Sequence, residues 1–101
     1  MDVIRGDDWI IDIPTLEWSD GAPVSSHELS SATYRATVAG LPATVTPDPE
    51  DGVRLRLEVS RDVTVLAVPS RRPYRSDVEI TIHNKRSTKL FNVTVLADVT
   101  I

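Results

Sequence analysis

The chain of 101 residues contains no cysteine, which excludes disulfides, zinc–thiolate sites and thiol chemistry. Aromatic residues are also scarce, with two Trp, two Tyr and one Phe, so we expect an aliphatic core. No stretch approaches the roughly 20 apolar residues of a membrane span, and the first residues lack the basic start and apolar run of a secretory signal. These absences predict a protein without a membrane partner, made and folded in the cytoplasm and stabilised by packing or by assembly.

An excess of positive charge is missing too. The 15 acidic and 11 basic residues give a net charge of −4, so we expect no nucleic-acid partner. The acidic residues lack the spacing of a calcium loop. His27 and His83 have no neighbour in the sequence that would complete a nucleophile–base pair. We therefore predict no metal, no cofactor and no catalytic residue, and an enzyme is the least favoured class.

Alternation of apolar and polar residues is the main pattern that the chain does contain. In 53–59, valines and leucines alternate with Arg54, Arg56 and Glu58, which predicts a strand with one dry face. Similar segments occur throughout the chain, at 9–13, 34–38, 77–83 and 88–101. The length suits one domain, which buries about 60–65% of the surface of its unfolded chain. We predict an all-β, single-domain β-sandwich of about seven mainly antiparallel strands, or a small barrel, over 9–101, preceded by an extended N-terminal segment, 1–8.

Local patterns give expectations for the connections. The apolar parity flips at Pro14, which predicts a kink in a strand that continues to Trp18. The polar stretch 24–31 has too few apolar positions for an amphipathic helix of usual length and is predicted to be a connection. Prolines and a glycine make 46–52 the clearest loop.

The C-terminal third of the chain is expected to end in a hairpin. Residues 62–68 fit either a strand or a single helical turn, because β-branched residues dominate but the apolar spacing is helical. The turn of the hairpin is predicted at 84–87, followed by a strand that reaches Ile101. The last residues of that strand must be paired, either within the domain or by a neighbouring molecule.

Arg5-Gly6-Asp7 matches a tripeptide read by cell-adhesion receptors, but it lies at the entrance of a predicted strand. We interpret it as a turn, in which Gly6 supplies the backbone conformation and Asp7 or Asp8 accepts backbone hydrogen bonds.

Several segments, in order along the chain, resemble small tail and baseplate components of tailed bacteriophages, in particular the N-terminal domain of upper baseplate proteins. The first is Ile-Arg-Gly-Asp-Asp-Trp at 4–9, followed by 20–24 and 32–36. The resemblance closes with Tyr-Arg-Ser-Asp-Val at 74–78 and Asp-Val-Thr at 98–100. The residues that this likeness marks as structural or interaction candidates are Arg5, Gly6, Asp7, Trp9, Tyr74, Asp77, Asp98, Val99 and Thr100.

The resemblance implies a non-enzymatic virion protein with an immunoglobulin-like sandwich, assembled in the host bacterial cytoplasm. Its implied partners are other virion proteins of the tail, baseplate, neck or fibres, which it contacts as multiple copies in a symmetric assembly. We expect the segment 1–8 and the final strand to be the contact edges. Two alternatives remain: a capsid decoration or head-fibre module, and a small module that binds carbohydrate or a host protein. Trp9 and Trp18 lie at parities that predict burial, which does not favour the second alternative.

Overall fold

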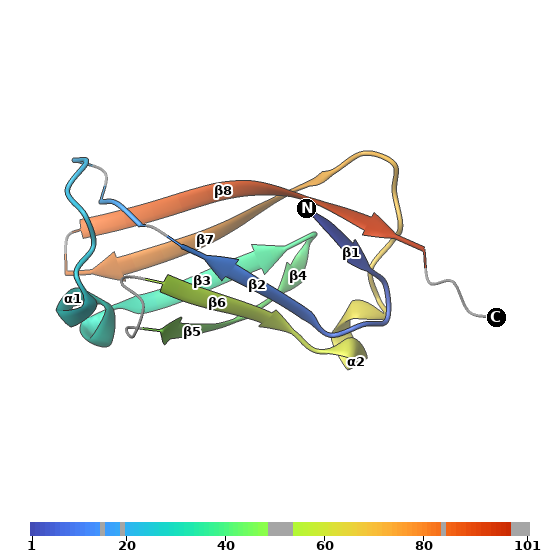
Figure 1. The fold of residues 1–101 in the computed structure, drawn as a ribbon, viewed down its shortest axis with the longest axis horizontal. Coiled ribbons are helices and arrows are strands. Elements are labelled where there is room, and N and C mark those ends of the chain that lie inside the picture. Colours follow the sequence, from blue (N-terminus) through green and yellow to red (C-terminus); the bar gives the residue numbers. More distant parts are fainter. Residues whose placement is uncertain (15, 19, 49–53, 84, 98–101) are drawn as a thin grey trace.

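The computed structural model describes residues 1–14, 16–18, 20–48, 54–83 and 85–97 (Figure 1). They form two stacked sheets, which confirms the predicted all-β class. The larger sheet has the order β1-β8-β7-β3-β4 and the smaller one the order β2-β6-β5. The strands are β1 Asp2–Ile4, β2 Trp9–Ile13, β3 Thr33–Val38, β4 Leu41–Pro42, β5 Thr44–Asp48, β6 Arg54–Val59, β7 Tyr74–Ile82 and β8 Lys85–Leu96. Among these strands, β1 and β8 pair in parallel, and the other pairs are antiparallel.

Strands β2 and β6 of the smaller sheet confirm the alternation predicted for them. Trp9, Ile11 and Ile13 of β2 are buried while the residues between them are exposed. In β6, Leu55 and Leu57 are completely buried, and β2 pairs with β6 from Trp9↔Val59 to Ile13↔Leu55. The dry faces of both strands therefore supply one wall of the aliphatic core.

The hairpin of β7 and β8 supplies most of the other wall. Its register runs without interruption from Tyr74↔Val93 to Ile82↔Lys85. The inward side chains Val78, Ile80 and Val93 are completely buried. The turn is tighter than predicted, because residues 85–87 already belong to β8.

The flip of the buried parity at Pro14 is confirmed, but the strand ends there instead of continuing through a kink to Trp18. Leu16 and Trp18 are buried after the parity flip, while β2 ends at Ile13 and only an isolated bridge follows, between Glu17 and Pro23. The segment leaves the sheet because proline cannot donate to the ladder.

Helix α1 (Ser26–Ser31) occupies the stretch predicted to be a connection, so that prediction is wrong. A capping box starts the helix: the Ser25 side chain accepts from the Glu28 N–H, and the Glu28 carboxylate accepts from the Ser25 N–H, both at 3.1 Å. Leu29 anchors the helix in the core, with 2% of its surface exposed. A single buried leucine and a cap are sufficient for a helix this short when the sandwich supports it.

Glu28 also ties α1 to the larger sheet. Its carboxylate accepts from Trp18 Nε1 at 3.1 Å and from Lys85 Nζ at 3.4 Å. The hydrogen bond from the Ser25 backbone, then that from Trp18, lowers the pKa of Glu28 to about 2. Lys85 Nζ lies 5.8 Å from the centroid of the Trp18 ring, so α1, the 16–18 segment and the start of β8 meet at one end of the molecule.

The loop predicted at 46–52 is wrong for its first three residues. Thr46, Pro47 and Asp48 belong to β5 and pair with β6. β5 is the outer strand of its sheet, and proline is tolerated on such strands because alternate backbone nitrogens point away from the ladder. Residues 49–53 lie outside the described residues.

The first and last described strands pair with each other. β1 lies beside the end of β8, with Asp2↔Thr94 and Ile4↔Leu96 as partners. The segment 1–8 therefore adds a strand to the larger sheet, and residues 94–96 are paired within the domain. The rest of the predicted final strand, 98–101, lies outside the described residues. None of the described helices has the length and hydrophobicity that a bilayer-spanning helix requires.

Candidate assembly surface

Helix α2 (Arg61–Thr64) settles the ambiguity at 62–68 in favour of a helical turn. The Ser60 C=O accepts from both Val63 N–H and Thr64 N–H at 2.9 Å, and Arg61 C=O accepts from Val65 N–H at 3.2 Å. After this turn, Val65, Leu66 and Val68 leave 45%, 70% and 68% of their surfaces exposed. Three large apolar side chains within four residues thus face solvent.

Thr64 fastens this turn to the chain that enters β2. Its side chain is completely buried, its hydroxyl donates to the Asp7 C=O at 2.7 Å, and the same oxygen accepts from the Gly6 N–H at 3.2 Å. In the sequence, Asp7 and Gly6 are 57 and 58 positions away from Thr64. These hydrogen bonds replace strand pairing for Thr64, which explains why a β-branched segment adopts a helical turn.

The Arg5-Gly6-Asp7 segment is a tight turn of the fold. The Asp7 N–H donates to the Ile4 C=O at 3.2 Å, and Gly6 adopts a φ of 90°, which favours glycine. Arg5 makes two contacts that fix the turn: its N–H donates to the Leu96 C=O at 3.0 Å, and its Nε donates to the Val65 C=O at 2.9 Å. The turn thus connects the end of β8 to the apolar segment after α2.

Three further side chains hold the same region. Trp9 is buried and donates from Nε1 to the Ile4 C=O at 2.8 Å. The Asp8 carboxylate accepts from the Arg61 N–H at 2.8 Å, at the start of α2. From the other side, the Tyr74 hydroxyl donates to the Val68 C=O at 2.7 Å. Hydrogen bonds to the Val65 and Val68 carbonyls therefore fix the backbone after α2, while the apolar side chains of this segment remain exposed to solvent.

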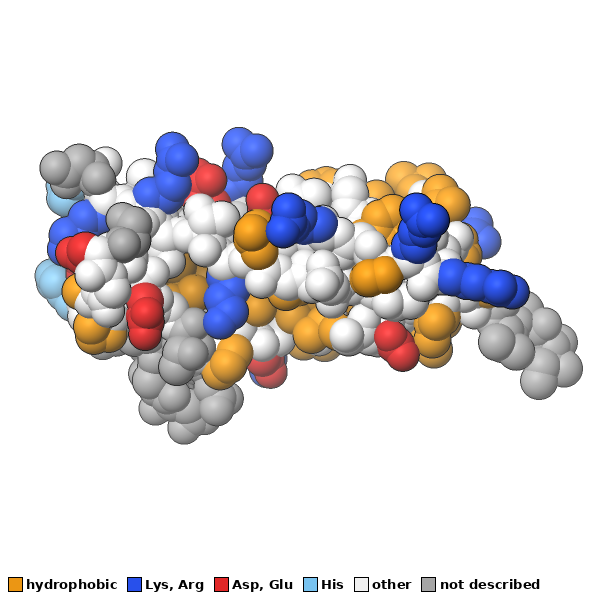
Figure 2. Space-filling model, turned by 90° about the horizontal axis from the view of Figure 1, so that it is seen from above, with side chains coloured by type: hydrophobic (Ala, Val, Ile, Leu, Met, Phe, Trp, Pro, Cys, Tyr) orange, Lys and Arg blue, Asp and Glu red, His pale blue; other side chains and the backbone are white. Residues whose placement is uncertain are grey.

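We call the exposed apolar side chains at this end of the sandwich the α2 surface; it consists of Ile4, Val65, Leu66, Val68 and Leu96. Figure 1 shows that α2 and the ends of β1 and β8 lie at the same end of the molecule, opposite α1. Apolar side chains gather at that end in Figure 2, interspersed with Lys or Arg side chains. An exposed apolar group of this kind is typical of a protein–protein contact site.

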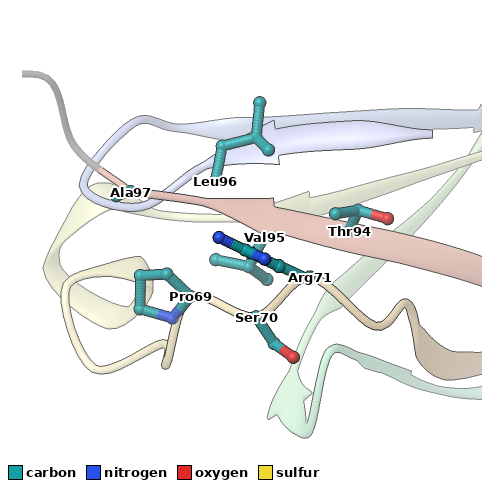
Figure 3. A pocket seen from close by; sticks show the side chains of 7 residues that line it. All are labelled: Pro69, Ser70, Arg71, Thr94, Val95, Leu96 and Ala97. Atoms are coloured by element: carbon teal, nitrogen blue, oxygen red, sulfur yellow. The ribbon is translucent and has the colours of Figure 1, made fainter.

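An open groove lies beside the α2 surface. Its volume is about 460 Å³, and it is lined by Pro69, Ser70, Arg71, Thr94, Val95, Leu96 and Ala97 (Figure 3). The Ser70 N–H donates to the Val95 C=O at 3.1 Å and so joins the two walls. The lining is mainly apolar with one guanidinium, which suits a contact with another protein better than acid–base chemistry.

The structure brings together five of the residues marked by the sequence: Arg5, Gly6, Asp7, Trp9 and Tyr74 all lie in the contacts around α2.

The other four candidates lie elsewhere. Asp77 is in the middle of β7, between Thr37 and Leu90, and takes no part in these contacts. Asp98, Val99 and Thr100 lie outside the described residues. In the described part of the chain, no group of three or more His, Cys, Asp or Glu residues is placed to hold a metal ion.

Sequence reasoning missed the residues that form the apolar surface itself. Val65, Leu66 and Val68 stand in a nearly continuous apolar run before Pro69, without the alternation that would bury half of it. This apolar run beside Arg71 and Arg72 was the sequence feature that could have indicated an exposed contact surface. Its exposure depends on Thr64, whose partners are distant in the sequence.

The energy that the surface can supply follows from its exposed area. A fully buried Val or Leu contributes about 1.5–3 kcal/mol. Because about half to two-thirds of each of the three side chains after α2 is exposed, covering them would contribute a gross ~3–5 kcal/mol. One such contact is weak by itself, and several acting together would be strong.

Comparison of the chain with models of protein families, with curated proteins and with solved structures finds no match.

Proposed function

We propose that this protein is a non-enzymatic structural component of a tailed-bacteriophage virion, which joins other tail, baseplate or neck proteins through the α2 surface. One observation carries the proposal. Four of the residues through which the chain resembles phage tail and baseplate components, Arg5-Gly6-Asp7 and Tyr74, fasten the exposed segment after α2. These four resembling residues therefore share one physical task, the presentation of an apolar contact surface.

The energetics favour a repeated component. A gross ~3–5 kcal/mol per apolar contact does not hold two free proteins together against the cost of association. Copies placed around a symmetry axis bind cooperatively, because each occupied site raises the effective concentration at the next. Several copies per particle are thus part of the proposal.

The alternative of a capsid decoration or head-fibre module uses the same sandwich at another place in the particle. The carbohydrate-binding alternative has less physical support. Trp9 and Trp18 each expose 3% of their surface, so neither offers a ring face to a sugar.

The experiment replaces Leu66 by Asp in a tagged copy and measures how much of it enters purified particles of the phage that encodes it. We expect incorporation to fall at least about tenfold, because a carboxylate in an apolar contact costs well over 1.4 kcal/mol. The matched control is Ile10→Asp, since Ile10 is an equally apolar, 61% exposed residue on β2 that is not part of the α2 surface.

Both variants should melt within a few degrees of the parent protein, because both side chains are exposed. Normal incorporation of Leu66→Asp, or loss of both variants to the same extent, would contradict the assigned surface. Purified particles without any copy of the chain would overturn the virion proposal. A label found only on heads would replace the tail position by the capsid alternative.

A further inference from the structure

Strand β8 extends far beyond the strand that covers its outer side. It has 12 residues, of which β7 pairs with 85–93. On the opposite side, β1 pairs with residues 94–96 only. Near the hairpin, the Ser87 hydroxyl donates to the Glu17 C=O, so the 16–18 segment approaches this side of β8 there. No described strand lies beside 88–92, which form an open edge of five residues.

The backbone groups on this edge can be assigned from the neighbouring pairs. The Thr94 N–H donates to the Met1 C=O at 2.8 Å, and the Leu96 C=O accepts from the Arg5 N–H at 3.0 Å, so even-numbered residues of β8 point toward β1. Because the register with β7 is unbroken, Thr88, Leu90 and Asn92 also direct their N–H and C=O groups outward. The edge is therefore ready to extend the ladder of the sheet, in line with β1.

Lys89 is the one charged residue of this edge, in a protein whose net charge is −4. Two further exposed cations of β8 precede the edge, but Lys85 already pairs with Glu28 at 3.4 Å and Arg86 with Glu79 at 3.9 Å, so Lys89 is the cation that the edge itself offers. Lys89 has the parity of the inward-facing residues yet reaches solvent at the rim of the sandwich. Leu90 is 54% exposed and supplies an apolar contact in the middle of the edge.

From these features we propose that 88–92 of β8 binds an extended segment of a partner protein that carries a carboxylate beside Lys89 and an apolar residue beside Leu90. The added strand would complete the ladder beside Thr88, Leu90 and Asn92, and its carboxylate would pair with Lys89. This inference deepens the proposed assembly function, on which it rests, by stating the chemistry of one partner segment.

A second copy of the chain fits this edge poorly. Pairing two β8 edges would bring together two Lys89 side chains with no carboxylate among 88–92 of either copy, and like charges across strands are destabilising. β1 also blocks each edge at residue 94, which keeps the shared ladder short. Lysines on an exposed edge discourage pairing with unselected strands, and the same charges favour an acidic one.

The test uses the purified full chain and the peptide acetyl-Glu-Glu-Val-Thr-Val-Glu-amide, titrated while backbone amide shifts are followed by NMR. We expect the largest shifts at the amides of Thr88, Leu90 and Asn92. Lys89→Glu should weaken binding at least about fivefold by reversing one charge pair. A peptide with Lys in place of Glu should not bind, and one with N-methyl groups on alternate residues should lose binding because it cannot form the ladder.

A pair of variants at one position separates backbone from side chain. Leu90→Pro removes an outward N–H without breaking a bond to β7 and should weaken binding about tenfold, whereas Leu90→Ala keeps the N–H and should bind better than Leu90→Pro. Melting curves of both variants establish that they remain folded. If Leu90→Pro unfolds, the N-methylated peptide and Lys89→Glu decide the matter.

Shifts centred on another strand, equal binding of the Lys peptide, or no binding at millimolar peptide would overturn the inference. Leu66→Asp should bind the peptide normally, because the α2 surface is separate from 88–92. Failure of the peptide experiment with loss of incorporation for Leu66→Asp would therefore refute this edge alone. The opposite pattern would refute the α2 surface.

Discussion

Replacing Thr64 by Val removes one hydroxyl and preserves the shape of a side chain that is completely buried at the base of α2. The substitution leaves the Asp7 C=O without the donor at 2.7 Å and the Gly6 N–H without the acceptor at 3.2 Å. Each buried group left without its partner costs about 1–3 kcal/mol. Because the turn is at the surface and water reaches part of it, we expect a total loss of about 2 kcal/mol in the free energy of unfolding.

Thermal and urea unfolding followed by circular dichroism measure this loss. For a domain near 100 residues, 2 kcal/mol corresponds to a fall in Tm of roughly 8 °C. Amide exchange adds a local readout, since the Gly6 N–H should exchange much faster in Thr64→Val than in the parent protein.

Two controls isolate the hydroxyl. Thr64→Ser keeps both hydrogen bonds and loses only a methyl group, so its Tm should lie between those of the parent and Thr64→Val. Thr88→Val makes the same chemical change at an exposed strand position and should alter stability by less than about 0.5 kcal/mol. If Thr64→Val melted at the same temperature as Thr88→Val, the hydrogen bonds of the Thr64 hydroxyl to Gly6 and Asp7 would not be what holds α2 in place.

Leu55→Asp puts a carboxylate at a completely buried position of β6 and should lower the free energy of unfolding by several kcal/mol. Glu58→Gln, on the solvent-exposed face of the same strand, should change it by less than about 0.5 kcal/mol. Urea unfolding of both variants tests which face of β6 is buried. Hydrogen bonds from the Ser25 backbone and from Trp18 lower the pKa of Glu28 from 4.5 to about 2, so they stabilise the fold above pH 4.5 and cease to do so as the pH falls toward 2. The Tm of the parent protein should exceed that of Glu28→Gln above pH 4.5, and the difference should shrink toward pH 2; a difference that stayed constant would contradict this linkage.

The parts of the fold that follow from local alternation were predictable from the sequence. Strands β2 and β6 have apolar residues at every second position, and burial of one face explains the pattern fully. Helix α1 was predictable as well, because Ser25 and Glu28 have the spacing of a capping box. The prediction of a connection at 24–31 was wrong because it gave more importance to the small number of apolar residues than to the capping box.

Other parts depend on contacts between distant residues. The helical turn at 61–64 is stabilised by hydrogen bonds between the Thr64 hydroxyl and the backbone of Gly6 and Asp7. The sequence around Thr64 contains no pattern that predicts these distant partners. The parallel pairing of β1 with β8 is also invisible locally, since three residues are too few for a periodic signal. The motif residues of the candidate site could be marked from the sequence, but the apolar surface that they hold could not.

The parallel β1–β8 pair determines how the domain would carry a mechanical load. Tension applied between residues 1 and 97 acts along both strands in opposite directions, because β1 leads away from its start in the direction in which β8 runs to its end. The bonds from Thr94 to Met1 and from Arg5 to Leu96, at 2.8 and 3.0 Å, lie across that axis and would be sheared together rather than peeled one after another. A force along the molecule therefore meets the combined resistance of this short ladder before the rest of the sandwich is strained.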